Sequence, residues 1–174
     1  MQKMNYPCFI TKRLALRTLN LQHASEIYHH FSSKDVTKFM DIEPCKDLRE
    51  AEEIIQFHLD DTGCRWGLFD KTSSALIGTA GYHLWQVTED FSKAEIGYDL
   101  AREYWGVGLM HESLIPIIDF GFTKMKLDFI EATVNPANFR SIRMLDRLGF
   151  QKQKELNDNL LYFVLIKDSW LAIN

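Results

Sequence analysis

The sequence is poor in residues that cross-link a chain covalently or through metal ions. Its 174 residues include only three cysteines, Cys8, Cys45 and Cys64, which are widely spaced. An odd number of cysteines without a CxxC pair argues against a disulfide framework and against a zinc motif. The histidines form no HxxxH or HExxH pattern either, so we expect no metal site.

Long apolar runs and excess positive charge are also missing. No run approaches the roughly 18 apolar residues that cross a membrane, and the first residues, MQKMNYPCFI, lack the apolar centre of a signal peptide. We therefore expect no membrane association and a cytoplasmic location. The net charge of −4 and the pI near 5.9 disfavour a nucleic-acid partner, because nucleic-acid-binding proteins favour a basic surface.

What is present is an ordinary globular composition. Hydrophobic residues make up 46% of the chain and charged residues 25%, which is enough apolar material for a core. No repeat, low-complexity segment or Pro/Gly/Ser-rich linker divides the sequence. We therefore expect a single domain over residues 1–174.

Apolar periodicity predicts an α/β sheet of mixed direction. Asn20, Asp47 and Asn138 are candidate helix N-caps, and Gly149 is a candidate glycine just after a helix. Pro116 lies inside a predicted helix and should kink or shorten it. The polar EDFS turn suggests an antiparallel hairpin between the two strands that flank it. Strands are expected at 9–19, 66–70, 74–88, 93–101, 129–134 and 160–166, and helices at 20–33, 47–61, 109–125 and 135–150.

Two glycines, Gly106 and Gly108, stand just before a predicted helix in the stretch EYWGVGLMHES. Glycine disfavours a helix by about 1 kcal/mol relative to alanine, so this placement needs a reason. The first N–H groups of a helix lack internal partners and lie at the positive end of its dipole. Glycine permits positive φ and leaves these groups open to a phosphate. The pattern fits neither the Walker motif nor GxGxxG, and alone it is also compatible with a plain turn.

Three segments, in order, resemble the GNAT superfamily of acyl-CoA-dependent N-acetyltransferases. TKRLALRTL resembles the opening strand. AEIGYDLAREYWGVGLMHES resembles a strand, an (R/Q)-x-x-G-x-(G/A) turn and the central helix, and VNPANFRSIRMLDRLGF resembles the later strand, Asn turn and helix. The chain is most similar to the ribosomal-protein N-terminal (Rim-type) branch, and the resemblance covers nearly all of it. It implies a mixed, mostly antiparallel central sheet of six to seven strands flanked by about four helices.

The resemblance also implies a site for acetyl-CoA as co-substrate, with no metal. The strands ending at Leu100 and Asn135 would splay apart, and the pantetheine arm would pair with one of them. Asn138 matches an asparagine that contacts the cofactor, although a simple N-cap is the alternative. Glu103 departs from the motif, because it stands at the (R/Q) position. The implied cofactor-binding residues are Tyr98, Asp99, Leu100, Tyr104, Trp105, Gly106, Val107, Gly108, Leu109, Met110, Asn135 and Asn138, with packing as the favoured role of Trp105.

Acetyl transfer to an amine requires a neutral amine, a donor to the thioester oxygen and a proton for the leaving thiolate. Glu95 lies near the family's acidic position and is the candidate base; a solvated or lysine-paired carboxylate is the alternative. The oxyanion donor is expected at a backbone N–H near Tyr98 or Asp99, where relatives carry a bulge. Many relatives place a tyrosine where this chain has Leu145. Ser141 is the candidate donor to sulfur, unless it only permits close helix packing.

The resemblance implies an enzyme that acetylates a primary amine, most simply the N-terminal α-amine of a protein or peptide. The α-amine has a pKa of about 7.7–8.0, well below that of lysine, so little deprotonation is needed. A small amine, such as a polyamine, amino sugar or antibiotic, is an alternative acceptor. A second alternative is that the protein is a catalytically silent acyl-CoA sensor, which the missing tyrosine and Glu103 support. A nucleotide-binding module is disfavoured, since the Walker lysine is absent. Fold analogy leaves a homodimer open.

Overall fold

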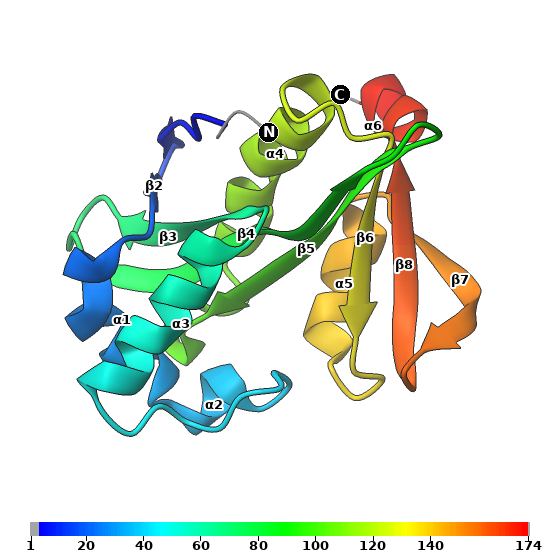
Figure 1. Cartoon of the computed structure of the whole chain (residues 1–174). Helices are drawn as coiled ribbons and strands as arrows, with labels where there is room; N and C mark the ends of the chain where they lie inside the picture. The colour runs from blue at the N-terminus through cyan, green and yellow to red at the C-terminus, as the bar shows by residue number, and fades with distance from the viewer. Residues whose placement is uncertain (1–3, 174) are drawn as a thin grey trace.

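A single sheet of eight strands forms the centre of the protein in the computed structural model, which describes residues 4–173 (Figure 1). The strand order is β1-β2-β3-β4-β5-β6-β8-β7. Every neighbouring pair is antiparallel except β5 and β6, which run parallel. The strands are β1 (Phe9–Ile10), β2 (Leu14–Thr18), β3 (Cys64–Asp70), β4 (Leu76–Val87), β5 (Ser92–Leu100), β6 (Phe129–Val134), β7 (Gln151–Asn157) and β8 (Leu160–Ile166).

Helices cover both faces of this sheet (Figure 1). α1 and α3 pack on one face and share a small core that includes Ile27 and Ile55. α4 and α5 contribute to a larger core on the other face, together with Trp66 and Tyr82 from the sheet. Burying each large side chain contributes about 1.5–3 kcal/mol. The helices are α1 (Ala24–Phe31), α2 (Lys34–Thr37), α3 (Leu48–Asp60), α4 (Leu109–Thr123), α5 (Phe139–Arg147) and α6 (Lys167–Ile173).

The predicted caps form where the sequence places them. The Asp47 carboxylate accepts the backbone N–H of Glu50 at 2.9 Å and begins α3. Asn20 caps a short 3₁₀ turn, Leu21–His23, that precedes α1. Gly149 follows α5 with a φ of 88°. Local side-chain chemistry is therefore enough to define these helix ends.

The predicted fold class is confirmed, but both of its element counts are wrong. Residues 4–173 form six α-helices rather than about four, because α2 and α6, with four and seven residues, are too short for helical periodicity to show in the sequence. The sheet has eight strands rather than six to seven, because segment 9–19 is interrupted at 11–13 and because residues 151–157 form an edge strand. Pro116 does not shorten its helix, since α4 continues through it to Thr123. Proline removes only one helical hydrogen bond, and the buried apolar residues on both sides of Pro116 hold the helix to the sheet.

The parallel pair β5–β6 separates along its length. The two strands pair only over Lys93–Glu95 and Phe129–Glu131. Beyond these residues β5 continues to Leu100 and β6 to Val134 without pairing to each other. Figure 1 shows the gap that opens between them. This divergence breaks the sheet next to the start of α4, as the resemblance implied.

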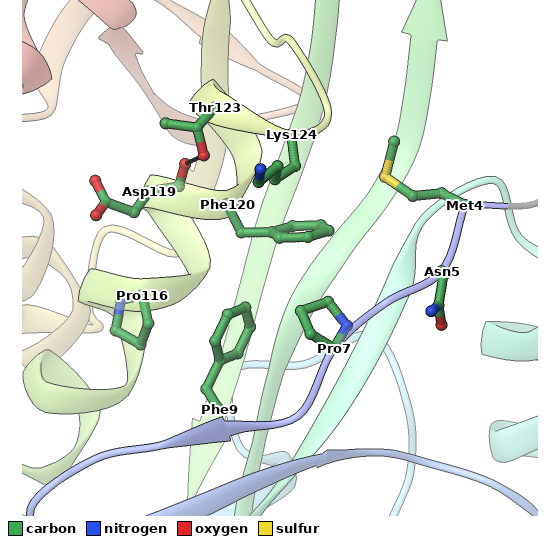
Figure 2. A pocket seen from close by; sticks show the side chains of 9 residues that line it. All are labelled: Met4, Asn5, Pro7, Phe9, Pro116, Asp119, Phe120, Thr123 and Lys124. Carbon is green, nitrogen blue, oxygen red and sulfur yellow. Dashed lines mark hydrogen bonds between the residues drawn. The ribbon is translucent and has the colours of Figure 1, made fainter.

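A smaller pocket lies away from this gap, between the N-terminal segment and α4. It has a volume of about 590 Å³, and Figure 2 shows Phe9 and Pro7 facing Phe120 across it. Asp119 at its border accepts a hydrogen bond from the Trp170 indole at 2.7 Å. Its lining is mostly apolar, and the N-terminal segment packs against α4 around it. Among the helices of residues 4–173, none is long and apolar enough to cross a membrane.

Candidate active site

A large cavity of about 1760 Å³ connects the gap between β5 and β6 with the region under α3. One side of it is formed by the start of α4 and by α5. The other side is formed by α2, α3, the loop between them, the start of β3 and the irregular part of β4 at His83 and Leu84. Small-ligand clefts usually measure about 300–1,000 Å³, so this cavity has room for a long ligand and a second molecule.

The glycine turn presents open amide groups to this cavity. Gly106 and Gly108 have φ angles of 79° and 83°, which confirms the positive φ predicted for this turn. The first N–H of the α4 ladder is that of Glu112, which donates to the Gly108 carbonyl at 3.1 Å. Within residues 4–173, no bond is made by the N–H groups of residues 106–111. A Cβ at Gly106 would meet no atom within 4 Å, so an anion can approach these groups directly.

The two aromatic residues before the glycines build the turn. The N–H of Tyr104 donates to Ala101 and that of Trp105 to Arg102, so neither is left for a ligand. The Trp105 indole donates to the Leu100 carbonyl at 2.7 Å. This bond ties the turn to the end of β5. The packing role favoured for Trp105 therefore has a structural basis.

Cationic side chains hold this turn from two sides. The Arg140 guanidinium lies 3.4 Å from the centre of the Trp105 ring, a cation–π contact. Arg13 donates to the Val107 carbonyl at 2.9 Å and pairs with Glu112 at 2.8 Å. Sequence reasoning missed the Arg13 contact, because it joins residues about a hundred positions apart. Glu103 is exposed and is not part of the cavity wall.

The free edge of β5 provides further backbone groups. The N–H of Ala101 donates to β4 at Ile77, and alternate residues of a strand direct their backbone groups to opposite sides. Tyr98 and Leu100 therefore direct theirs into the gap. The Leu100 carbonyl already accepts the Trp105 indole, so its N–H and both groups of Tyr98 remain open.

The bulge expected near Tyr98 or Asp99 is not found. The β4–β5 register is continuous from Gly78↔Leu100 to His83↔Glu95, and the irregularity lies instead between His83 and Gln86 on β4. Backbone alternation directs the N–H of Asp99 toward β4. Of the two expected oxyanion donors, only the Tyr98 N–H therefore faces the gap.

The start of α5 lies on the other side of the gap. The Asn138 side chain accepts the N–H of Ser141 at 3.3 Å, which confirms its role as N-cap. Its amide NH₂ makes no bond within the described residues, and both Asn138 and Asn135 line the cavity. The Ser141 hydroxyl lies 2.8 Å from the Tyr98 hydroxyl. Burial raises the pKa of Tyr98 well above its usual value, so this phenol stays protonated and able to donate.

Glu95 lies where β5 and β6 begin to separate. It is half-buried, lines the cavity and accepts the Thr133 hydroxyl at 2.6 Å. The nearest lysine on its strand, Lys93, pairs instead with Glu131 at 3.0 Å. Glu95 is thus neither fully solvated nor paired with a lysine. Two histidines, His83 and His58, line the same part of the cavity. We call Glu95, Thr133, His83 and His58 the Glu95 cluster.

A second polar group on the same face of β5 is fully buried. The Asp99 carboxylate accepts Arg65 at 2.8 Å and the Thr79 hydroxyl at 2.6 Å, and lies 2.6 Å from His30 Nε2. We call these four residues the Asp99 cluster. Burial by itself would raise the pKa of Asp99, but His30, Arg65 and Thr79 outweigh it and lower the pKa to about 2. The Asp99 side chain is thus committed to this cluster, and alternation directs its backbone toward β4.

Histidine, cysteine, aspartate and glutamate side chains form no group of three or more that could hold a metal ion within residues 4–173. The site offers instead open amides at one end, a free strand edge in the middle and a carboxylate at the point of strand divergence. This set can bind a phosphorylated, extended ligand and place its far end beside Glu95.

Comparison with known proteins agrees with this geometry. Residues 13–151 match the acetyltransferase (GNAT) domain family. The protein named "Uncharacterized N-acetyltransferase p20" of Bacillus licheniformis is 38% identical over 152 residues, covering 85% of this chain and 84% of that protein. The [ribosomal protein uS5]-alanine N-acetyltransferase of Escherichia coli (strain K12) is 33% identical over 108 residues, covering 62% of this chain and 55% of that enzyme.

Solved structures show the same fold. The ribosomal-protein-S5-alanine acetyltransferase from Vibrio fischeri superposes with a TM-score of 0.76 at 23% identity, over 95% of this chain and 99% of that one. A GCN5-related N-acetyltransferase from Brucella melitensis has a TM-score of 0.82 at 17% identity, over 98% and 83%. The family match and the sequence relatives together identify the activity class. The chain belongs to the GNAT acetyltransferase family and is an acetyl-CoA-dependent N-acetyltransferase.

Proposed function

We propose that this enzyme acetylates the N-terminal α-amine of a protein or peptide by direct attack in a ternary complex. The observation that carries the proposal is a single cavity that is lined both by the glycine turn at the start of α4 and by Glu95, and that continues to α2 and α3. A cytoplasmic location, where acetyl-CoA is made and used, is part of the proposal.

The cofactor half would use backbone groups more than side chains. The N–H groups of residues 106–111 would hold the diphosphate, with the helix dipole adding favourable charge. The Leu100 N–H and the Tyr98 carbonyl would pair with the pantetheine arm. Asn138 would contribute its free amide NH₂. The other implied residues, Asp99, Tyr104 and Trp105, would shape the site without donating to the ligand.

The reacting half would use three side chains. Acetyl-CoA supplies an activated thioester. Glu95 would take a proton from the acceptor ammonium, directly or through one water. The Tyr98 N–H would stabilise charge on the thioester oxygen, which leaves the Tyr98 carbonyl and the Leu100 N–H to pair with the pantetheine arm. Ser141 would donate to the sulfur, and the buried Tyr98 phenol at 2.8 Å would hold and resupply its proton. This pair takes the place of the tyrosine that Leu145 replaces.

A peptide acceptor is favoured by the size of the cavity. Its volume of about 1760 Å³ continues past Glu95 to α2 and α3, which leaves a groove long enough for several residues. An α-amine also has a pKa of only about 7.7–8.0, so a single carboxylate suffices to deprotonate it. The related [ribosomal protein uS5]-alanine N-acetyltransferase, which is named for a protein acceptor, supports this choice.

A small cationic amine is the second candidate, and the charge of the acceptor wall favours it. Carboxylates from α2, the loop that follows it, α3 and the residue just after α3 line that wall, and they would attract a polyamine. They are Asp35, Asp41, Glu43, Glu50, Glu53 and Asp61.

A thiol-release assay with a matched panel of acceptors tests the proposal. The panel contains short peptides with free and with blocked N-termini, the same peptides with lysine, and polyamines. We expect free N-terminal peptides to turn over and blocked ones to remain unmodified. Turnover of polyamines alone would assign the second candidate. Binding of coenzyme A without turnover of any amine would identify a sensor instead.

A further inference from the structure

The amine loses two protons during acetylation, but the site described so far supplies one acceptor for them. An ammonium must lose one proton before its nitrogen can attack. The nitrogen becomes cationic again as the new N–C bond forms, so a second proton must leave to give the amide. Glu95 can take the first. A second acceptor beside the same nitrogen would allow both transfers without waiting for Glu95 to empty.

His83 lies where such an acceptor is needed. It is the cross-strand partner of Glu95 in the β4–β5 ladder, and side chains of paired residues lie on the same face. The next residue, Leu84, has a φ of 53°, and the ladder is irregular from His83 to Gln86. Bulges and positive φ at a non-glycine residue re-aim side chains and occur next to active sites.

The His83 ring lies over Gly97, close to the Tyr98 backbone. A Cβ built on Gly97 would lie 2.7 Å from His83 Cε1 and 3.1 Å from Nε2. The ring therefore occupies the space that any larger residue at 97 would fill. This places an imidazole nitrogen within a few ångströms of the free strand edge, one residue from the proposed oxyanion donor.

Charged and titratable groups from three neighbouring elements, α3, β3 and β5, surround His83. His58 of α3 stacks with it at 6.5 Å between ring centres. Arg65 of β3 and Glu95 of β5 flank it, and Asp61 and Asp41 are the more distant acids. Burial, together with the charge of Arg65, lowers the pKa of His83 to about 4. The imidazole is therefore neutral near pH 7 and able to accept a proton.

We propose that His83 is a catalytic residue that accepts the second proton from the acceptor nitrogen. The inference rests on the proposed function, since it needs an amine beside Glu95. The N–C bond forms at the acetyl carbon and the C–S bond breaks. The nitrogen proton moves to the free imidazole nitrogen and then to water in the open cavity, while Ser141 gives a proton to the departing sulfur and regains one from solvent through Tyr98, so that one proton is released per turnover. A weak base suffices, because a nitrogen that is being acylated becomes strongly acidic.

The test compares His83→Gln with His29→Gln, an exposed histidine of α1 outside the cavity lining, as matched control. Glutamine keeps a polar side chain but cannot take the proton. We expect kcat to fall by about 100-fold in H83Q and by less than threefold in H29Q. The dissociation constant for coenzyme A, measured by calorimetry, should stay within twofold in both variants.

The pH profile separates a proton-transfer role from a structural one. In the wild-type enzyme kcat/KM should level off above the pKa of the acceptor amine. In H83Q it should keep rising, because hydroxide replaces the imidazole. Added imidazole should raise the kcat of His83→Ala at least tenfold. A kcat of H83Q within threefold of wild type, or a uniform loss with an unchanged profile and no rescue, would overturn the inference.

A readout without turnover completes the test. In a dead-end complex of unacetylated coenzyme A with the peptide that turns over best, the NMR signals of the His83 ring should shift, while those of exposed His29 should not. Unshifted His83 signals would contradict contact with the acceptor. Failure of the wild-type enzyme to acetylate any amine would instead overturn the proposed function, and this inference with it.

Discussion

Two polar clusters lie side by side on one face of β5 and differ in how completely their groups are partnered. Asp99 is buried and accepts bonds from three side chains, one of them an arginine. Glu95, four residues earlier, borders the cavity and accepts one side-chain bond, from Thr133. A fully partnered buried carboxylate stabilises a fold, whereas a sparsely partnered one beside a cavity is available for chemistry. The comparison teaches that position on the same strand face does not decide the role; the number of partners does.

The largest expected effect comes from breaking the buried cluster. Asp99→Asn would leave the Arg65 guanidinium buried without its counter-charge, which costs about 3–5 kcal/mol in typical cases. Urea unfolding of the purified variant, followed by circular dichroism, measures this loss. A change below about 1 kcal/mol would mean that water enters and solvates Arg65.

Glu95→Gln should lower activity strongly and stability little, in contrast to Asp99→Asn. We expect kcat to fall by about 100-fold, with the unfolding free energy changed by less than about 1 kcal/mol, because this surface is open to the cavity. The loss should be greater at pH 6 than at pH 9, since more of the amine is neutral at high pH. Unchanged kinetics across this range would remove Glu95 from the mechanism.

The pH dependence of stability should also separate the clusters. The pKa of Asp99 is lowered from 3.8 to about 2, so its contribution of roughly 2 kcal/mol is present above pH 4 and is lost as pH falls toward 2. Burial lowers the pKa of His83 to about 4 and that of His58 to about 3. Between pH 6.5 and 4 the unfolded chain therefore binds more protons than the folded protein does. The free energy of unfolding decreases as the pH is lowered through this range.

Replacing both histidines tests whether they cause the pH dependence of stability between pH 6.5 and 4. The double variant H58Q/H83Q should lose most of the slope between pH 6.5 and 4 and keep the fall that Asp99 causes below pH 4. Unfolding curves at half-unit pH intervals would show it. An unchanged slope in the upper window would place the titrating groups elsewhere.

The smallest expected effects come from two matched threonines. Thr79 donates to Asp99 and Thr133 to Glu95, both at 2.6 Å. Thr79→Val should cost about 1–3 kcal/mol of stability, because Asp99 and Arg65 each lose a buried partner. Thr133→Val should cost less than about 1 kcal/mol and lower kcat by a few fold. Equal stability losses in the two variants would erase the distinction between the clusters.

Local patterns predicted the elements and the glycine turn well. Caps such as Asp47 and the positive φ of Gly106 and Gly108 depend on neighbours within a few residues, which the sequence displays directly. Alternation also predicted correctly that Glu95 and Gly97 share a face, since the Glu95 partner His83 lies over Gly97. The gap between β5 and β6 followed from the family resemblance rather than from periodicity.

Contacts between distant elements were not predictable in this way. The Asp99 cluster joins α1, β3, β4 and β5, and no spacing in the sequence brings these four elements together. The importance of His83 depends on an irregular ladder and a positive φ at Leu84, which is an unusual conformation for a leucine. The continuation of α4 through Pro116 likewise depends on packing, which outweighs local propensity.

The most direct measurement is a crystal structure of the protein with coenzyme A. We expect the diphosphate within hydrogen-bond distance of the N–H groups of residues 106–111 and the pantetheine along Tyr98 and Leu100, with its sulfur between Glu95 and Ser141. A cofactor bound elsewhere, or phosphates held only by side chains away from the glycine turn, would contradict this expectation.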